Sequence, residues 1–371
     1  MVNKKFWAAT FTLTGTIIGA GILGLPYVFA KSGFLTGVFW IIIIAALMIF
    51  VNLCLGEITL RTKGKHQLSG YAEKYLGKWG KRIMFFAMVF GIYSALLAYI
   101  VGEGDSISKI VPGGYPPIIF GIMFWLLMTT LLREGLKGLK KIETWGVSVI
   151  VIIISIIFIK FMPTIQSKNL LTFNPSQFIT PIGVIIFAFL GFTSIPELRE
   201  EIKGQEAKLK KAIIIGCLIP AFLYILFSAA IVGILGANVN QVATLSLGSF
   251  ITLLGTLTMF TSYLVLSFSL KDAFKYDLKS SDKTIFFFVS LVPLIIYIII
   301  THFQLLSFTY ILGIGGVISG GLTGIMILII TKKAKEKTKR KIPKIQMPLN
   351  WISITIISLL FIMGIILECF L

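Results

Sequence analysis

The chain has 371 residues, of which 57% are apolar and only 13% are charged. The charged share is about half that of soluble globular domains, and the Lys and Arg residues behind the net charge of +19 lie in short segments between long apolar runs. This pattern excludes a soluble globular protein. The basic segment 332–344 has no aromatic residues, which argues against nucleic acid as a partner. The class that fits the composition is an all-α membrane protein.

Eleven stretches of about 20 mainly apolar residues are long enough to cross a bilayer as helices. They run from 6–30, 35–58, 82–110, 116–134, 142–161, 177–201, 210–236, 242–271, 284–301, 303–330 and 349–370. The three cysteines, Cys54, Cys217 and Cys369, lie in or at the end of these stretches, where they fit as small packing residues.

Positive charges predict how these spans are oriented. With the N-terminus inside the cell, the inner segments hold 30 of the 34 Lys and Arg residues. Because cytoplasmic loops carry the excess of positive charge, we expect a multi-pass protein of the cell membrane with a cytoplasmic N-terminus and an external C-terminus. In the first inner loop, the helical spacing of Leu68, Tyr71 and Tyr75 predicts a short amphipathic helix at the membrane interface.

Two of the spans carry helix-breaking residues at corresponding places. Gly21 and Gly191 are each followed five positions later by a proline, and each lies about 15 residues into its span, near the middle of the bilayer. The first span enters from the inside and the other from the outside, which is typical of an inverted repeat. Tight helix packing through small residues is the alternative for either glycine.

Unwound backbone is tolerated in a membrane only where it lines a polar site. The N-terminus of a half-helix favours a carboxylate, and the carbonyls at a C-terminus favour an ammonium group or a metal cation. An α-amino acid carries both charges, so a pair of breaks of this kind suits it as a ligand.

The runs Gly19-Ala-Gly-Ile-Leu-Gly-Leu-Pro26 and Phe189-Leu-Gly-Phe-Thr-Ser-Ile-Pro-Glu197 resemble those of the amino acid/auxin permease family, in the amino acid–polyamine–organocation superfamily. Related aromatic and neutral amino acid permeases share much of the pattern. The resemblance covers nearly the whole chain. It implies two inverted five-helix repeats, here 1–161 and 177–331, with an additional helix at 349–371. It also implies a secondary active transporter that works by alternating access, and not an enzyme.

A substrate site is predicted around the two breaks. The N–H groups of residues 19–21 are expected to bind the substrate carboxylate, and the carbonyls of Ile17 and Leu190 its ammonium group. The aromatic residues beside Gly191 are expected to shape a pocket for a neutral, bulky or aromatic side chain. The resemblance implies that Tyr99 lies beside the substrate, although a lone membrane tyrosine is otherwise a packing or interfacial residue. The full set is Ile17, Gly19, Ala20, Gly21, Tyr99, Phe187, Leu190, Gly191, Phe192 and Thr193.

The coupling ion is predicted from hydroxyls in span 242–271. The resemblance implies a sodium site between this span and carbonyls of the first span. The matching positions are Gly15, Ile18, Thr258, Thr261 and Ser262. Oxygen ligands suit a hard cation, and span 142–161 has no lysine before Lys160, where proton-coupled relatives carry one. Sodium is therefore the expected coupling ion and the proton the alternative; hydroxyls that only bond their own helix are the simplest alternative of all. No other cofactor is expected.

Four acidic residues lie in or near the spans. Glu197 follows the second break, where a carboxylate is costly and marks either a functional site or an ion pair with a nearby base. Glu57, Glu103 and Asp105 lie near span ends and are expected to be solvated.

Two other classes of membrane protein fit less well. A membrane-embedded enzyme needs a nucleophile, base or metal cluster at depth, but His66 and His302 lie in a loop and at a span end. A channel usually needs a ring of pore residues from symmetric subunits. The expected partners are therefore an amino acid substrate, a coupling ion and the lipid bilayer.

Overall fold

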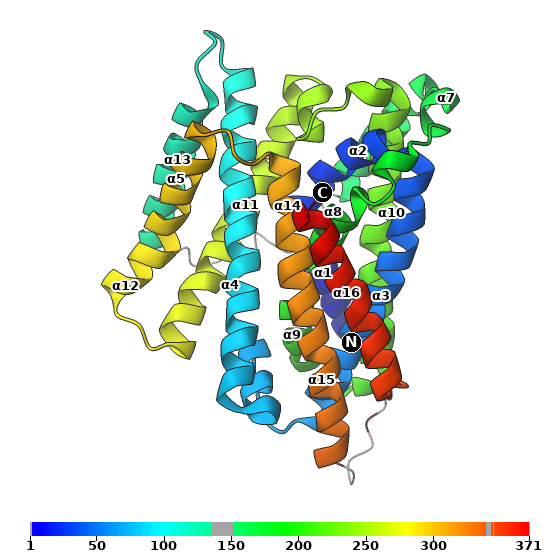
Figure 1. Ribbon diagram of the computed structural model, residues 1–371, viewed down its shortest axis with the longest axis vertical. Coiled ribbons are helices and arrows are strands. Elements are labelled where there is room, and N and C mark those ends of the chain that lie inside the picture. The colour runs from blue at the N-terminus through cyan, green and yellow to red at the C-terminus, as the bar shows by residue number, and fades with distance from the viewer. Residues whose placement is uncertain (1, 135–150, 339–342, 344, 371) are drawn as a thin grey trace.

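The computed structural model describes residues 2–134, 151–338, 343 and 345–370, and these form helices joined by turns, with no strand among them. Residues 142–150 of the predicted span 142–161 lie outside this description. Most helices run along one long axis and lie side by side (Figure 1). The longer helices are α1 (Val2–Ile17), α2 (Gly21–Ser32), α3 (Phe34–Arg61), α4 (Leu68–Ile110), α5 (Pro117–Glu134), α8 (Pro181–Ala188), α9 (Ile195–Glu201), α10 (Leu209–Leu235), α11 (Ser249–Asp272), α12 (Asp282–Phe286), α13 (Val292–His302), α14 (Phe308–Gly315), α15 (Gly321–Lys337) and α16 (Trp351–Phe370).

The described helices fit a polytopic membrane protein. Eight segments are long and apolar enough to span a bilayer, and the bent pair Lys4–Ile17 with Gly21–Ser32 makes up to nine. Two shorter apolar helices, Pro117–Arg133 and Val151–Thr164, fall at the two other predicted spans. The fold class is confirmed; the count of eleven, the inverted repeat and the orientation stay predictions.

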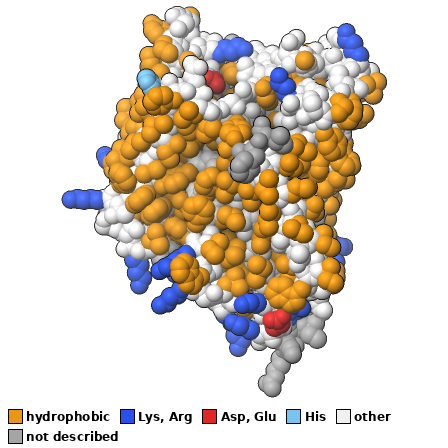
Figure 2. Space-filling view, in the orientation of Figure 1, with side chains coloured by type: hydrophobic (Ala, Val, Ile, Leu, Met, Phe, Trp, Pro, Cys, Tyr) orange, Lys and Arg blue, Asp and Glu red, His pale blue; other side chains and the backbone are white. Residues whose placement is uncertain are grey.

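The outer surface agrees with this class. Figure 2 shows a broad belt of hydrophobic side chains between two ends that carry Lys and Arg. On the described surface, Ile42 is 61% exposed and Ile159 is 70% exposed. Such apolar area is unfavourable in water but costs nothing against lipid chains.

Both predicted helix breaks are present. The axes of α1 and α2 differ by 57° across residues 18–20. The break therefore precedes Gly21, and Pro26 lies buried inside α2. The second break follows Ala188, passes through a 3₁₀ turn at Phe192–Ser194 and ends where α9 begins. Pro196 fits the first turn of α9 because an N–H there would have no helical partner.

The broken helices lie at the centre of the bundle. α10 packs on both α1 and α2, and α8 packs on α2, α3 and α14. α4 packs on α5, α11, α14 and α15, whereas α16 lies against α15 at the edge (Figure 1). The first turns of α4 form a separate short helix that ends in a kink at Gly77 (φ 76°), as the spacing of its apolar residues predicts.

Candidate functional site

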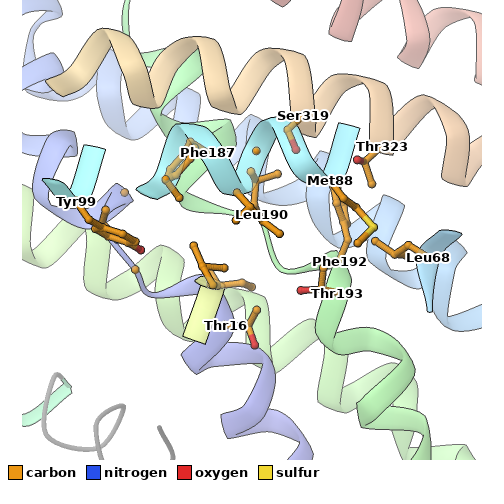
Figure 3. Close-up of a pocket in the computed structure, with 18 residues that line it drawn as sticks. Thr16, Leu68, Met88, Tyr99, Phe187, Leu190, Phe192, Thr193, Ser319 and Thr323 are labelled. Atoms are coloured by element: carbon orange, nitrogen blue, oxygen red, sulfur yellow. The ribbon is translucent and has the colours of Figure 1, made fainter. Parts of the chain in front are cut away.

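A cavity of about 130 Å³ lies where the two breaks meet. Figure 3 shows Tyr99 at one end and Leu68 and Thr323 at the other, with Phe187 and Leu190 between them. Because Leu68 begins α4, the cavity extends from the middle of the bundle toward the end predicted to be cytoplasmic. Its described lining contains hydroxyl groups but no Asp, Glu, Lys or Arg.

Nine predicted substrate residues line this cavity. They are Ile17, Gly19, Ala20, Gly21, Tyr99, Phe187, Leu190, Phe192 and Thr193. Gly191, the tenth, faces away from it: a Cβ there would lie 2.7 Å from Ile17 Cγ1 and 3.0 Å from Leu13 Cδ1. Gly191 therefore lets the second break pack closely on α1, while its neighbours supply the side chains at the cavity.

Tyr99 connects α4 to the first break. It is buried, and its hydroxyl accepts a hydrogen bond from Ala20 N–H at 3.3 Å. The same hydroxyl interacts with Ser262 of α11. Tyr99 thus holds one amide of the unwound segment beside the cavity.

Tyr224 of α10 connects the two breaks to each other. Its hydroxyl lies 2.8 Å from the carbonyl oxygen of Ile17 and 2.7 Å from that of Ala188, so its proton is shared between the last residues of two half-helices. Since α1 and α8 both end in the bilayer interior, their free carbonyls need such a donor. Sequence reasoning missed this residue because nothing local marks one buried tyrosine among apolar residues.

Gly19 and Gly21 serve different purposes. A Cβ on Gly19 would lie 3.1 Å from Tyr99 Oη, at the cavity, whereas a Cβ on Gly21 would lie 2.5 Å from Ala188 Cα. Binding of the substrate carboxylate by the Gly21 N–H stays a prediction, but the missing side chain of Gly21 has another role. Its absence leaves room for the backbone of α8, because the two broken helices touch there.

Other lining residues were also not predicted. Met88, Ile92 and Ala95 reach the cavity from α4 and share a face with Tyr99, because spacings of three and four return to the same side of a helix. Once Tyr99 was placed, that periodicity could have indicated them. Ser319 and Thr323 reach the cavity from the end of the glycine-rich segment 313–321 and from α15 (Figure 3). The spacing of these two hydroxyl residues by one helical turn is the sequence signal that could have indicated them.

The predicted sodium ligands do not line the main cavity. The hydroxyl of Thr261 donates to its own helix, to the carbonyls of Leu257 at 3.2 Å and Thr258 at 3.0 Å. Thr258 lines a separate cavity of about 40 Å³ with Ile22 and Leu23. Gly15 and Ile18 lie at the end of α1 and in the break, and Ser262 faces Tyr99. Gly15, Ile18 and Ser262 therefore lie at or beside the first break, whereas the bonds of Thr261 stay within α11.

Two carboxylates expected in solvent are instead buried. Glu57 accepts hydrogen bonds from Arg61 and from Met347 N–H, and its carboxylate lies 3.4 Å from Lys335 Nζ. Glu103 is fully buried in α4. Helix packing, which distance from the span end does not reveal, overturns the prediction for both. Asp105 is only partly buried.

At the end that is predicted to be cytoplasmic, polar contacts join α1, α9 and the loop before α4. Thr12 donates to Glu201 at 3.1 Å, and Arg199 Nη1 donates to Gly64 O at 3.2 Å. Glu197, also in α9, lines a surface cavity with Arg199 and Lys65. Glu197 belongs to this region of polar contacts and does not line the main cavity.

A helical membrane bundle with a small, uncharged cavity between two broken helices is the architecture of a transporter of small solutes. Comparison with known proteins agrees. Residues 2–368 match the tryptophan/tyrosine permease family, and the chain belongs to it. The family consists of permeases and not enzymes.

Curated relatives carry amino acids according to their names. The chain is 25% identical to tyrosine-specific transport system 1 of Haemophilus influenzae over 75% of each chain. It is 26% identical to glutamine transporter 2 of Aliivibrio fischeri, over 64% of this chain and 63% of that protein. It is 25% identical to the low affinity tryptophan permease of Proteus vulgaris, over 62% and 59% respectively. The chain is therefore a permease, and these relatives of it are amino acid transporters.

Proposed function

We propose that this protein transports neutral amino acids with large side chains by alternating access. The observation that carries the proposal is the position of the cavity, at the meeting point of two helix breaks and without a charged side chain in its described lining. A cavity of about 150 Å³ accepts benzene in a protein core, so about 130 Å³ suits an aromatic ring. The names of relatives that carry tyrosine and tryptophan support the same class.

The substrate would lie across the first break. The N-terminus of α2 offers amides and the positive end of a 12-residue helix, which favours the carboxylate. The ammonium group would face the carbonyls of Ile17 and Leu190. Ile17 O already accepts from Tyr224, but a carbonyl oxygen has a second lone pair for a second donor. Phe187, Phe192 and Thr193 would surround the side chain.

Alternating access would require the contacts at the end predicted to be cytoplasmic to open. The Thr12–Glu201 and Arg199–Gly64 bonds join α1, α9 and the first loop, so they would have to break for release toward the cytoplasm. Exposed polar contacts of this kind contribute little individually, which makes such an opening energetically accessible.

The coupling ion has two candidates. Sodium, held by Gly15, Ile18, Thr258, Thr261 and Ser262, is the candidate that the sequence favours. The proton is the second, and the buried carboxyl of Glu103 favours it.

The test is uptake by the purified protein in proteoliposomes. Tyrosine, tryptophan and glutamine are compared with lysine and glutamate, each under a sodium gradient, a proton gradient or neither. We expect saturable uptake of the neutral substrates and at least tenfold less of the charged ones, because burying an unpaired charge in this cavity costs several kcal/mol. Equal uptake of lysine or glutamate would contradict the proposal, and empty liposomes are the control.

We also propose the orientation predicted by the positive charges, with the N-terminus and segment 332–344 in the cytoplasm. A Thr338→Cys variant without the native cysteines should react with an impermeant thiol reagent only after the cells are permeabilised. Reaction in intact cells would reverse the orientation.

A further inference from the structure

Glu103 is a buried acid without an ion-pair partner among the described residues. Its side chain is fully buried in α4, and neither carboxyl oxygen makes a hydrogen bond to the described part of the chain. Thr256 of α11 faces it without completing one. An ionised carboxylate in such a place costs several kcal/mol, so the carboxyl is neutral and carries a proton in this conformation.

Glu57 shows that burial alone does not produce this state. It is also fully buried, but Arg61 lies 2.7 Å from its carboxylate and Lys335 lies 3.4 Å from it. Two cations and the Met347 N–H compensate for the lost water. Through these ion pairs Glu57 joins α3 to α15, whereas no cation of the described residues contacts Glu103.

Glu103 also lies on a polar line that begins at the substrate cavity. Tyr99, Glu103 and Ser106 follow one another at spacings of four and three, so they share one face of α4. Tyr99 bonds the Ala20 amide at the cavity, and the buried hydroxyl of Ser106 has no hydrogen bond within the described chain. This line runs from the cavity toward the end of α4 predicted to be external.

Among the residues that the structure describes, no charged side chain is placed to neutralise this acid. On α4 itself the neighbouring charges are Asp105, which points partly to solvent, and Lys109, whose amine bonds the carbonyl of Leu245. The other titratable residues of the helices packed here are Tyr263 on α11, Tyr297 and His302 on α13 and Tyr310 on α14. The charged residues of α5 and α11 lie at their opposite ends, from Arg133 and from Lys271 onward.

We propose that Glu103 is the site at which this transporter binds and releases a proton during its cycle. The inference rests on the proposed transport function and specifies its coupling. In the conformation described here the site is loaded. A conformation that opens the Ser106 end of the line to water would stabilise the carboxylate by hydration, and the proton would leave to, or arrive from, water on that side. Because Tyr99 lies one turn away, the same opening can change the substrate site.

The first measurement does not depend on transport. Infrared difference spectra of the purified protein between neutral and strongly alkaline pH should contain the C=O stretch of a buried, protonated carboxylic acid. We expect that band to disappear in Glu103→Gln and to remain in Asp105→Asn, the matched control two residues away. A wild-type spectrum without the band, or a band that survives in Glu103→Gln, would overturn the proposal even if the protein carried no amino acid.

The second measurement is uptake of tyrosine into sodium-free proteoliposomes under an imposed proton gradient. Glu103→Gln keeps the shape and neutrality of the loaded site, so exchange of labelled for unlabelled tyrosine should stay within threefold of wild type. Uphill accumulation should fall to the equilibrium level, while Asp105→Asn accumulates normally. Full accumulation by Glu103→Gln would place the proton elsewhere. Absence of any uptake or exchange in wild type would instead contradict tyrosine transport, and the infrared result would still decide whether Glu103 binds a proton.

Discussion

The two helix breaks differ in where their polar groups are directed. In the first break, Ala20 N–H donates to Tyr99, a side chain of another helix. In the second, the groups return to their own turn: Ser194 N–H and its hydroxyl both donate to Gly191 O, and Leu190 N–H donates to Phe187 O. The two breaks are alike in one respect, because the Tyr224 hydroxyl bonds a helix-end carbonyl of each.

This difference separates two tasks within one cavity. The first break keeps its backbone amides near the cavity, where they can bind a charged group. The second break satisfies its own backbone and contributes mainly side chains, among them Phe192 and Thr193. The substrate's charged end and its side chain would accordingly be recognised by different halves of the chain.

The largest effect on substrate binding is expected when a side chain fills the space at the first helix break. Gly19→Val would place a branched side chain near Tyr99 Oη, because the Cβ alone would lie 3.1 Å from it. We expect at least about a hundredfold weaker substrate binding, roughly 2.7 kcal/mol, with little loss of thermal stability.

Gly21→Ala is the matched control, measured by the same binding assay and thermal unfolding. Its Cβ would lie 2.5 Å from Ala188 Cα, and backbone cannot move aside cheaply, so this variant should lose stability instead. Near wild-type binding by Gly19→Val would show that the substrate does not use the first break.

Removing the shared donor tests what the breaks have in common. Tyr224→Phe leaves the carbonyls of Ile17 and Ala188 without their donor in a buried place, at an expected cost of about 1–3 kcal/mol. The apparent melting temperature should fall accordingly. Tyr263→Phe, on α11, removes another buried hydroxyl away from the breaks and is the control; an equal loss there would deny Tyr224 a special role.

The sequence predicts the regular part of this structure well and the cross-helix contacts poorly. Long apolar runs indicate the helices, and Gly191 with Pro196 indicates the second break, because these signals are local. Tyr224 and Glu103 acquire their meaning only from helices distant in sequence. Gly21 shows the same limit, because a glycine signals a close approach and the sequence does not say to what.

Removing the hydroxyl of Tyr99 tests the cross-helix contact that is particular to the first break. Tyr99→Phe removes the acceptor for Ala20 N–H while it keeps the ring. A hydrogen bond of this kind contributes about 0.5–1.5 kcal/mol, so substrate binding should weaken by about tenfold or less. Tyr93→Phe, also on α4, removes a hydroxyl that bonds Phe288 O at 2.7 Å and should leave binding unchanged. Equal effects in both variants would mean that Tyr99 acts only through the packing of α4.

The last prediction concerns sodium, which would sharpen the comparison by adding an ion to the first break alone. In this structure the Thr261 hydroxyl donates to the carbonyls of Leu257 and Thr258, which leaves the lone pairs of its oxygen available to a cation. Coupling between two bound ligands is typically about 1–3 kcal/mol, and we expect sodium to raise substrate affinity by a factor in that range. Thr261→Ala combined with Ser262→Ala should abolish that response, because both removed oxygens are predicted ligands of one buried ion. The measurement is substrate binding to purified wild type and double variant, with sodium or with choline at equal ionic strength. If sodium does not change substrate binding to the wild type, or if the double variant keeps the full sodium response, the predicted sodium site is wrong. The proton at Glu103 is then the proposed coupling ion.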